Sequence, residues 1–253
     1  MTSASTAARL RLLTVLLLLA VAPGCSQPAE GSTTLTVHAA ASLRGPFEEL
    51  VELFEEEHPD VTVRLNVAGS ADLVAQVEEG APADVVATAD TATMERLAAD
   101  GLVTDPTPFA ANTLVIVVPR GNPADVAGLR DLAGDVDLVV CAPQVPCGAA
   151  AARVEEAAGV AFTPVSEEQS VTDVLGKVRA GEAEAGLVYV TDALSAGDHL
   201  EVIEFEEASE AVNVAPVAVA SGSERPALAR AFADLVTSPT GERVLTEAGF
   251  RRP

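Results

Sequence analysis

Four short segments combine small or hydroxyl-bearing residues in a way that suits the binding of an anion. They are Ala41-Ser42, Gly69-Ser70, Pro146-Cys147-Gly148 and Ser170-Val171, and no lysine or arginine is adjacent to the expected donors. Each segment stands directly before a predicted helix. The first backbone N–H groups of a helix have no partner inside it, and the helix start carries roughly half a positive charge. The segments are therefore candidate anion sites.

Together these segments would supply enough donors to surround one tetrahedral oxyanion. The hydroxyls of Ser42 and Ser70 and the backbone amides of Cys147 and Val171 are the expected donors if all face one cleft. Tyr189, the only tyrosine, ends a predicted strand and would add a phenolic O–H. Such a set offers no carboxylate to accept the proton of a protonated anion, so it favours a fully deprotonated one.

Each of these residues also has a plainer interpretation when it is taken alone. The two serines are then helix N-caps, Cys147 is a structural residue, and Tyr189 is a packing residue with a hydrated hydroxyl. Only the set as a whole indicates a binding site.

The elements that must position these residues alternate between strand and helix. Pro46 begins a helix in which Phe47, Leu50, Val51 and Phe54 share one face. The predicted order in this half is strand 35–40, helix from 46, strand 61–67, helix from 70, strand 84–87 and helix 91–100. This alternation predicts an α/β fold with a mostly parallel sheet flanked by helices.

Two apolar, β-branched runs, 112–119 and 212–220, are long enough to cross between two lobes. The second α/β set between them comprises strand 136–141, a helix from about 148, helix 172–180 and strand 185–190, and the chain closes with helices 226–236 and 239–248. We therefore expect lobe 1 to contain 34–111 and 213–253, and lobe 2 to contain 112–212. Two crossing strands would join the lobes at a hinge.

The N-terminus has the features of an export signal. Arg9 and Arg11 precede an apolar run from 12 to 22 that only Thr14 interrupts, and Pro23-Gly24-Cys25 follows. Eleven residues are too few for a transmembrane helix, which needs about 20. We predict a signal peptide at 1–24, lipidation of Cys25 and a tether at 25–33; ordinary signal cleavage nearby is the alternative. One lipid attachment would anchor the protein to the outer face of the cytoplasmic membrane.

The charge of the chain excludes several partners. The sequence has 38 acidic and 15 basic residues, and the predicted signal holds two of the basic ones, so the mature chain carries 13 basic and 38 acidic residues, a net charge of −25. A nucleic-acid partner is excluded on this ground. The same field repels an anionic ligand, but salt screens it beyond about 8 Å, so capture needs short-range donors in a cleft.

Cys141 and Cys147 remain as a pair if Cys25 is lipidated. In an oxidising compartment a disulfide is the default expectation. A zinc site has weak support, because His38, His58 and His199 have no ligand spacing with one another or with the cysteines. The histidines are interpreted as surface or strand-end residues.

Five segments, in this order and spacing, resemble the periplasmic molybdate-binding proteins of ABC transporters over essentially the whole mature chain. They are Ala39-Ala40-Ala41-Ser42-Leu43, Ala68-Gly69-Ser70, Gly80-Ala81-Pro82-Ala83-Asp84-Val85, Val145-Pro146-Cys147-Gly148 and Gly186-Leu187-Val188-Tyr189.

The resemblance implies a type II periplasmic-binding-protein fold and a monomer that binds molybdate, and tungstate with it, and delivers the anion to an ABC permease and its ATPase subunit. It implies no cofactor. By matching motif, it implies that the ligand is held by Ser42, Ser70, Cys147, Val171 and Tyr189. The family often has alanine where Cys147 stands, which is harmless if only the backbone amide binds. A Cys141–Cys147 bond would then stiffen the ligand loop.

Three alternatives stay open. An enzyme has little support, because no histidine is paired with a nucleophile and no Gly-Lys-Ser/Thr phosphate loop is present. A receptor for another small oxyanion, such as sulfate, is the more serious alternative, because fold alone does not determine the ligand. A sensor or adhesion role without transport is the third.

Overall fold

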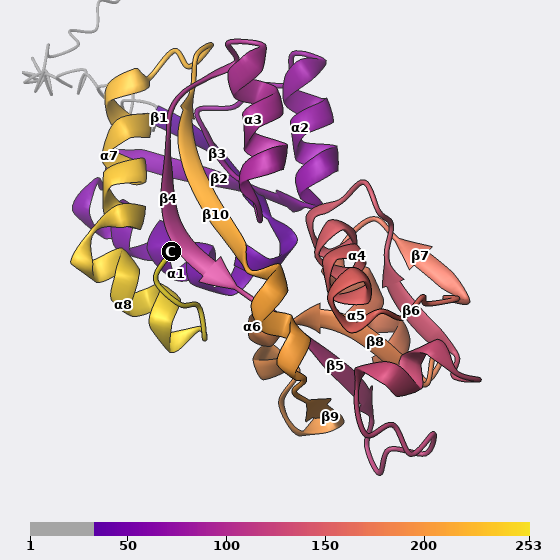
Figure 1. The fold of residues 1–253 in the computed structure, drawn as a ribbon. Helices are drawn as coiled ribbons and strands as arrows, with labels where there is room; N and C mark the ends of the chain where they lie inside the picture. Colours follow the sequence, from indigo (N-terminus) through magenta and orange to yellow (C-terminus); the bar gives the residue numbers. More distant parts are fainter. Residues whose placement is uncertain (1–32) are drawn as a thin grey trace, which may run out of the picture. The chain divides into compact units, whose positions relative to one another are not determined.

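The computed structural model describes residues 33–253, which form two five-stranded sheets flanked by helices (Figure 1). The first sheet has the order β2-β1-β3-β10-β4, with β1 (Thr33–Ala40), β2 (Val61–Ala68), β3 (Val85–Ala87), β4 (Val103–Asn112) and β10 (Asn213–Ala220). The second has the order β7-β6-β8-β5-β9, with β5 (Leu114–Pro119), β6 (Leu138–Cys141), β7 (Ser166–Glu168), β8 (Ala185–Tyr189) and β9 (Leu200–Ile203). We call each sheet with its helices lobe 1 and lobe 2. The predicted signal peptide, Cys25 and the tether up to residue 32 lie outside the described residues.

One strand in each sheet runs against its neighbours. In lobe 1, β10 is antiparallel to β3 and to β4, and in lobe 2, β5 is antiparallel to β8 and to β9. The pairs of β1 with β2 and β3, and of β6 with β7 and β8, are parallel. Four of the five strands in each sheet therefore share one direction. The predicted α/β class with mostly parallel sheets is confirmed.

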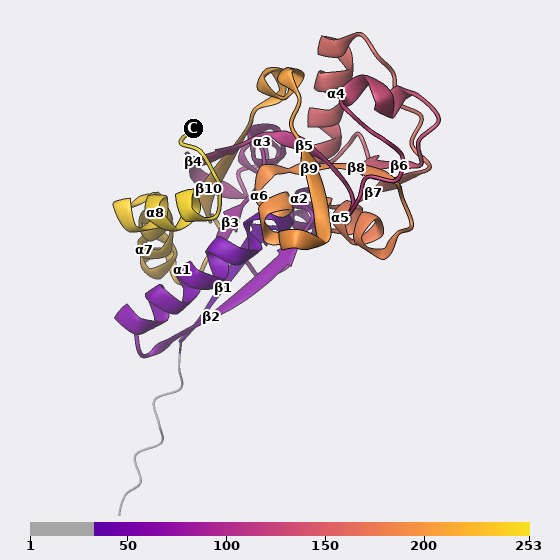
Figure 2. The ribbon, with the colours of Figure 1, turned by 90° about the horizontal axis from the view of Figure 1, so that it is seen from below.

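Helices cover both faces of the lobe 1 sheet. One face packs on α1 (Arg44–Glu57), α7 (Pro226–Thr237) and α8 (Pro239–Glu247), and the other on α2 (Ser70–Glu78) and α3 (Thr91–Ala99). Figure 2 shows the same helices from below. Within β3, Val85 and Ala87 belong to the first cluster and Val86 to the second, as the alternation of a strand requires.

Lobe 2 is built in the same way around one apolar cluster. It contains the helices α4 (Pro146–Ala158), α5 (Val171–Ala180) and α6 (Val190–Ser195). Ile116 and Val117 are both fully buried although they point to opposite faces of β5. Its continuous apolar run is therefore that of a strand covered on both sides. Short 3-10 helices complete the chain: η1 (Ala41–Leu43), η2 (Leu129–Ala133), η3 (Gly197–His199) and η4 (Glu206–Ala211).

The chain passes between the sheets twice, between β4 and β5 and again just before β10. Asn112, the last residue of β4, is paired with Asn213, the first residue of β10. The sequence did not predict the first part of β4, nor β7, β9 and α6. Pro106 and Pro108 lie in β4, and they are tolerated there because β4 is an edge strand with one bonded neighbour.

The interpretation of the histidines is wrong for His38. This side chain is buried inside β1 and burial lowers its pKa. Among residues 33–253, no group of three or more His, Cys, Asp or Glu side chains is arranged to hold a metal ion. In the same range, no helix is long and apolar enough to span a membrane.

Asp192, in the first turn of α6, is a carboxylate whose pKa is clearly shifted by burial. Its Oδ2 atom is buried and has no hydrogen-bond partner among the described residues. Burial raises its pKa from 3.8 to about 7, and backbone hydrogen bonds at Tyr189 and Asp192 oppose this shift. Below about pH 4 the group is protonated in both the folded and the unfolded chain. Between pH 4 and 7 the Asp192 carboxyl ionises only in the unfolded chain, so the free energy of unfolding falls as pH rises. This loss of stability is complete once the pH is well above 7.

Asp192→Asn removes this ionisation and keeps the shape of the side chain. We expect the free energy of unfolding to rise by on the order of 2–4 kcal/mol at pH 8, and the gain to shrink towards zero near pH 4. Urea denaturation at three pH values measures the difference. Asp198→Asn, at an exposed position close by, is the control. A gain of equal size at all pH values would contradict the explanation.

Gly148 and Gly176 provide a matched test of the packing around α4. A Cβ atom at Gly148 would lie 1.9 Å from the carbonyl oxygen of Ala142, whereas one at Gly176, in α5, would meet nothing within 4 Å. We expect Gly148→Ala to lower the free energy of unfolding by about 1–3 kcal/mol or more, because the backbone must move. Gly176→Ala should raise it by about 0.5–1 kcal/mol. Chemical denaturation measures both, and equal effects would refute the close contact.

Candidate ligand-binding site

A small cavity of about 20 Å³ lies between the lobes and is lined from both sides. It brings together all five residues that the sequence singles out: Ser42, Ser70, Cys147, Val171 and Tyr189. The other lining residues are Ala40, Ala41, Gly69, Ala89, Val145, Pro146, Gln169 and Ser170. None of the lining residues is charged. The volume exceeds the roughly 10–15 Å³ that one water needs and is far below the roughly 300 Å³ of sites for drug-sized ligands.

Lobe 1 contributes two serines from the ends of neighbouring parallel strands. Ser42 lies in η1, directly after β1, and Ser70 is the first residue of α2, directly after β2. Because β1 and β2 are parallel, their carboxyl ends share one edge of the sheet. The Ser70 hydroxyl oxygen accepts a hydrogen bond of 3.0 Å from the amide of Ala89. The hydroxyl proton of Ser70 is therefore free to be donated to another group.

Lobe 2 contributes the N-termini of two helices. Pro146 is the first residue of α4 and has no N–H, so the amide of Cys147 is the first donor of that helix. Val171 is the first residue of α5, and the Ser170 side chain before it caps the amide of Asp173. The amides of Cys147 and Val171 have no intrahelical acceptor, and they carry the positive ends of two helix dipoles.

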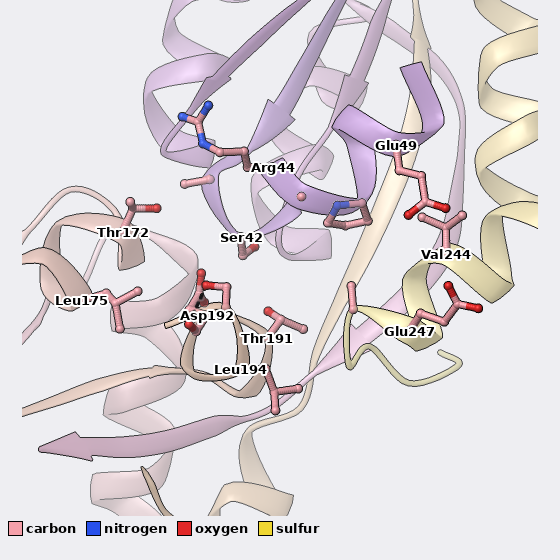
Figure 3. A pocket seen from close by; sticks show the side chains of 15 residues that line it. Ser42, Arg44, Glu49, Thr172, Leu175, Thr191, Asp192, Leu194, Val244 and Glu247 are labelled. Atoms are coloured by element: carbon pink, nitrogen blue, oxygen red, sulfur yellow. Dashed lines mark hydrogen bonds between the residues drawn. The ribbon is translucent and has the colours of Figure 1, made fainter. Parts of the chain in front are cut away.

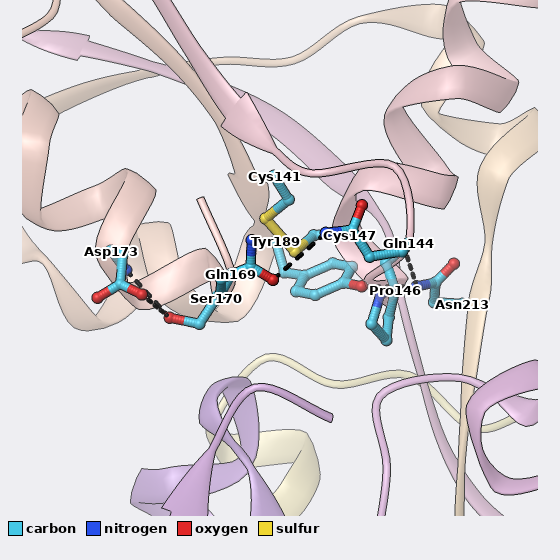
Figure 4. Close-up of a disulfide and its surroundings, with 9 residues drawn as sticks. All are labelled: Cys141, Gln144, Pro146, Cys147, Gln169, Ser170, Asp173, Tyr189 and Asn213. Carbon is cyan, nitrogen blue, oxygen red and sulfur yellow. Dashed lines mark hydrogen bonds between the residues drawn. A yellow bond between two sulfur atoms is a disulfide. The ribbon is translucent and has the colours of Figure 1, made fainter. Parts of the chain in front are cut away.

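A disulfide between Cys141 and Cys147 holds the loop in front of α4 (Figure 4). The two Cα atoms are 5.6 Å apart. The bond ties the last residue of β6 to the first turn of α4, so it closes the loop that carries Val145 and Pro146. The helix start that presents the Cys147 amide is thus fixed covalently to the sheet.

Tyr189 lies at the end of β8 with 2 % of its surface exposed. Burial raises its pKa well above 10, the nearby carboxylates of Asp90 and Asp192 raise it further, and Asn213 and Arg153 oppose the shift. The phenol therefore keeps its proton at neutral pH. Its oxygen accepts a hydrogen bond of 2.5 Å from the side-chain amide of Asn213 (Figure 4). The arrangement makes Tyr189 a donor.

A larger hollow of about 500 Å³ borders the same gap between the lobes (Figure 3). Ser42 lines both spaces, but the hollow also contains Arg44, Glu49, Asp192 and Glu247. Three of these four ionisable side chains are acidic. The hollow is therefore a poorer place for an anion than the uncharged cavity beside it.

Sequence reasoning missed two residues near the site. Gln169 lines the cavity, and Asn213 contacts the Tyr189 hydroxyl. A signal existed for Asn213, because an amide at the start of an apolar, β-branched run is out of place unless it has a partner. Gln169 had no signal in the sequence.

Comparisons with known proteins agree on the family. A model of the bacterial extracellular solute-binding proteins matches residues 35–251. The molybdate-binding protein ModA of Mycobacterium tuberculosis is 47% identical over 228 residues, which are 89% of this chain and 87% of that protein.

Two solved structures share the fold. The periplasmic molybdate-binding protein of Azotobacter vinelandii is 20% identical with a TM-score of 0.75, and the match covers 87% of this chain and 99% of that one. The sulfate-binding protein SubI of Mycobacterium tuberculosis is 22% identical with a TM-score of 0.68, and the match covers 87% of each chain. At this identity the structures support the fold alone, whereas the family model and ModA cover most of the chain at the level of sequence. The chain therefore belongs to the bacterial extracellular solute-binding protein family, in the group that contains the ModA proteins.

Proposed function

We propose that this protein captures molybdate, and tungstate with it, in the cavity between its lobes. The observation that carries the proposal is the set of donors in the cavity wall: the hydroxyls of Ser42, Ser70 and Tyr189 and two helix N-termini, with no charged side chain. These groups suit a small, fully deprotonated oxyanion, because they donate hydrogen bonds and offer no carboxylate to a protonated oxygen. The 47% identical relative is a molybdate-binding protein.

Sulfate is the alternative ligand, since the sulfate-binding protein SubI shares the fold and fold alone does not determine the ligand. Sulfate is also fully deprotonated at neutral pH, so the uncharged wall does not exclude it. Size and donor geometry would distinguish the two anions. Phosphate is disfavoured, because it retains a proton near neutral pH and the cavity wall has no carboxylate to accept that proton.

The proposed mechanism is closure of the two lobes on the anion. Ser42 and Ser70 belong to lobe 1, and the helix starts of α4 and α5 belong to lobe 2, so the complete set of donors exists only when the lobes approach. The anion shifts the population towards the closed form because only that form offers all contacts. The proposal extends to delivery: the closed form, a monomer held to the membrane by a lipid on Cys25, docks on an ABC permease.

Removal of either serine hydroxyl should weaken binding. We expect Ser42→Ala and Ser70→Ala each to raise the Kd for molybdate by about tenfold or more, since each removes one hydrogen bond to a charged ligand. Calorimetric titration of residues 31–253 with molybdate, tungstate, sulfate and phosphate gives the Kd values. Ser195→Ala, which lines the larger hollow and not the cavity, is the matched control.

Two results would count against this assignment. Unchanged molybdate affinity in both serine variants would show that the anion binds elsewhere. Tight binding of sulfate with no heat from molybdate or tungstate would keep the site and replace the ligand.

Lobe closure can be tested separately at Gly69, which precedes α2. A Cβ atom there would lie 2.5 Å from the carbonyl oxygen of Gln169 in lobe 2. The backbone at Gly69 has φ −58° and ψ 141°, which alanine adopts without strain, so lobe 1 should fold normally. We expect Gly69→Ala to raise the Kd by about tenfold.

The control for this variant is Gly45→Ala, which also faces the gap between the lobes but has nothing within 4 Å of the added methyl group. Titration calorimetry measures affinity, and thermal denaturation of the free protein checks that stability is preserved. Wild-type affinity in Gly69→Ala would show that the lobes need not approach this closely to hold the anion.

A further inference from the structure

Asn213 forms hydrogen bonds to three residues of lobe 2, one in β8 and two in α4. Its side-chain nitrogen Nδ2 donates to the Tyr189 hydroxyl oxygen at 2.5 Å and to the Pro146 carbonyl oxygen at 3.2 Å. Its oxygen Oδ1 accepts a hydrogen bond from the Arg153 guanidinium. With 2 % of its surface exposed, Asn213 itself belongs to lobe 1 as the first residue of β10.

These partners determine which end of the amide faces the tyrosine. A carbonyl oxygen can only accept a hydrogen bond, so the NH₂ group of Asn213 must face the Pro146 carbonyl. A guanidinium can only donate, so the amide oxygen of Asn213 must face Arg153. The group that faces Tyr189 is therefore a donor. Consequently the phenol oxygen accepts from Asn213, and its own proton must be directed elsewhere.

The remaining direction leads towards the ligand cavity, which Tyr189 lines. Asn213 does not line that cavity and cannot touch a ligand there. We propose that Asn213 is a positioning residue, which holds the Tyr189 hydroxyl so that its proton is presented to the oxyanion. This inference rests on the proposed function, because it concerns how one donor of that site is oriented.

Arg153 strengthens the arrangement. Its positive charge at the oxygen of the amide polarises the NH₂ group, and the polarised NH₂ group in turn makes the phenol a better donor. The hydrogen bonds thus connect the guanidinium of Arg153, through the buried amide of Asn213, to the neutral hydroxyl of Tyr189. The site gains from a positive charge without placing that charge in the cavity wall.

The position of Asn213 also connects this donor to the crossing between the lobes. Asn213 is paired with Asn112, the last residue of β4. The Asn112 side chain donates to the Thr191 hydroxyl at 2.8 Å, two residues beyond Tyr189. Two asparagines on the crossing strands therefore hold the same short segment of lobe 2, but only Asn213 contacts the ligand donor.

Asn112 provides the control for Asn213, because both amides are buried at the crossing and both form hydrogen bonds to side chains of lobe 2. A merely structural role would make Asn213→Leu and Asn112→Leu weaken molybdate binding to a similar extent. A positioning role predicts that Asn213→Leu raises the Kd by about tenfold and Asn112→Leu by no more than about twofold.

A double-mutant cycle with Tyr189→Phe separates orientation from stability. If Asn213 acts through the hydroxyl, its loss should cost almost nothing more once the hydroxyl is absent, so the double variant should bind molybdate within about twofold of Tyr189→Phe alone. In contrast, Asn112→Leu should raise the Kd by the same small factor in the Tyr189→Phe variant as in the wild type. Additive losses for Asn213→Leu and Tyr189→Phe would overturn the proposal.

Tyr189 also offers a direct signal, since the chain has no other tyrosine and no tryptophan. The near-ultraviolet difference spectrum on addition of molybdate should show a tyrosine that donates a new hydrogen bond in the wild type and in Asn112→Leu, and should lose that feature in Asn213→Leu. The same spectrum in all three proteins would contradict the proposal. If the wild type binds molybdate and the cycle shows no coupling, the inference alone fails. If the wild-type protein binds none of the four anions in calorimetry, both the proposed function and this inference are wrong.

Discussion

An acidic protein can hold an anion only through donors that lie closer to it than its own carboxylates do. The chain has 38 acidic and 15 basic residues, and the field of this excess repels any anion at long range. Salt screens this repulsion at longer range, so the groups that line the cavity decide whether an anion binds there, and none of the lining residues is charged. The fold meets this constraint, because strand-to-helix connections in both lobes supply such donors at the edges of their sheets.

The constraint also explains the reinforcement around each donor. A neutral donor binds well only if its geometry is fixed beforehand, since it has no net charge to compensate for a poor angle. The Ala89 amide occupies the oxygen of Ser70, the disulfide holds the start of α4, and Asn213 occupies the oxygen of Tyr189. At Ser70 and Tyr189 the second group occupies an acceptor position of the hydroxyl oxygen and leaves its proton to be donated, whereas the disulfide fixes the position of the Cys147 amide.

Local chemistry made much of this predictable from the sequence. Helix starts such as those at Ser70 and Val171 follow from the polar residues that precede an apolar period, and the alternation of elements gave the α/β class. The structure places the five residues around one cavity, while their roles as ligands stay a prediction. The Asn213–Tyr189 contact was not predictable, because it joins residues 24 positions apart in different sheets. The edge strands β4, β7 and β9 were missed for a different reason: they are short, or they contain proline and charge, so the sequence pattern is weak.

The placement of β10 has a consequence for the order in which the chain acquires structure. This strand lies between β3 and β4, yet it follows the whole of lobe 2 in the sequence. Until residues 213–220 emerge from the ribosome, β4 has no neighbour in its sheet, and the sheet of lobe 1 is incomplete. The strands of lobe 2 are contiguous in sequence, so that lobe can close first, whereas lobe 1 depends on a late, long-range pairing of the slow kind. A strand that is synthesised after all of lobe 2 therefore completes the sheet of the lobe whose synthesis began first.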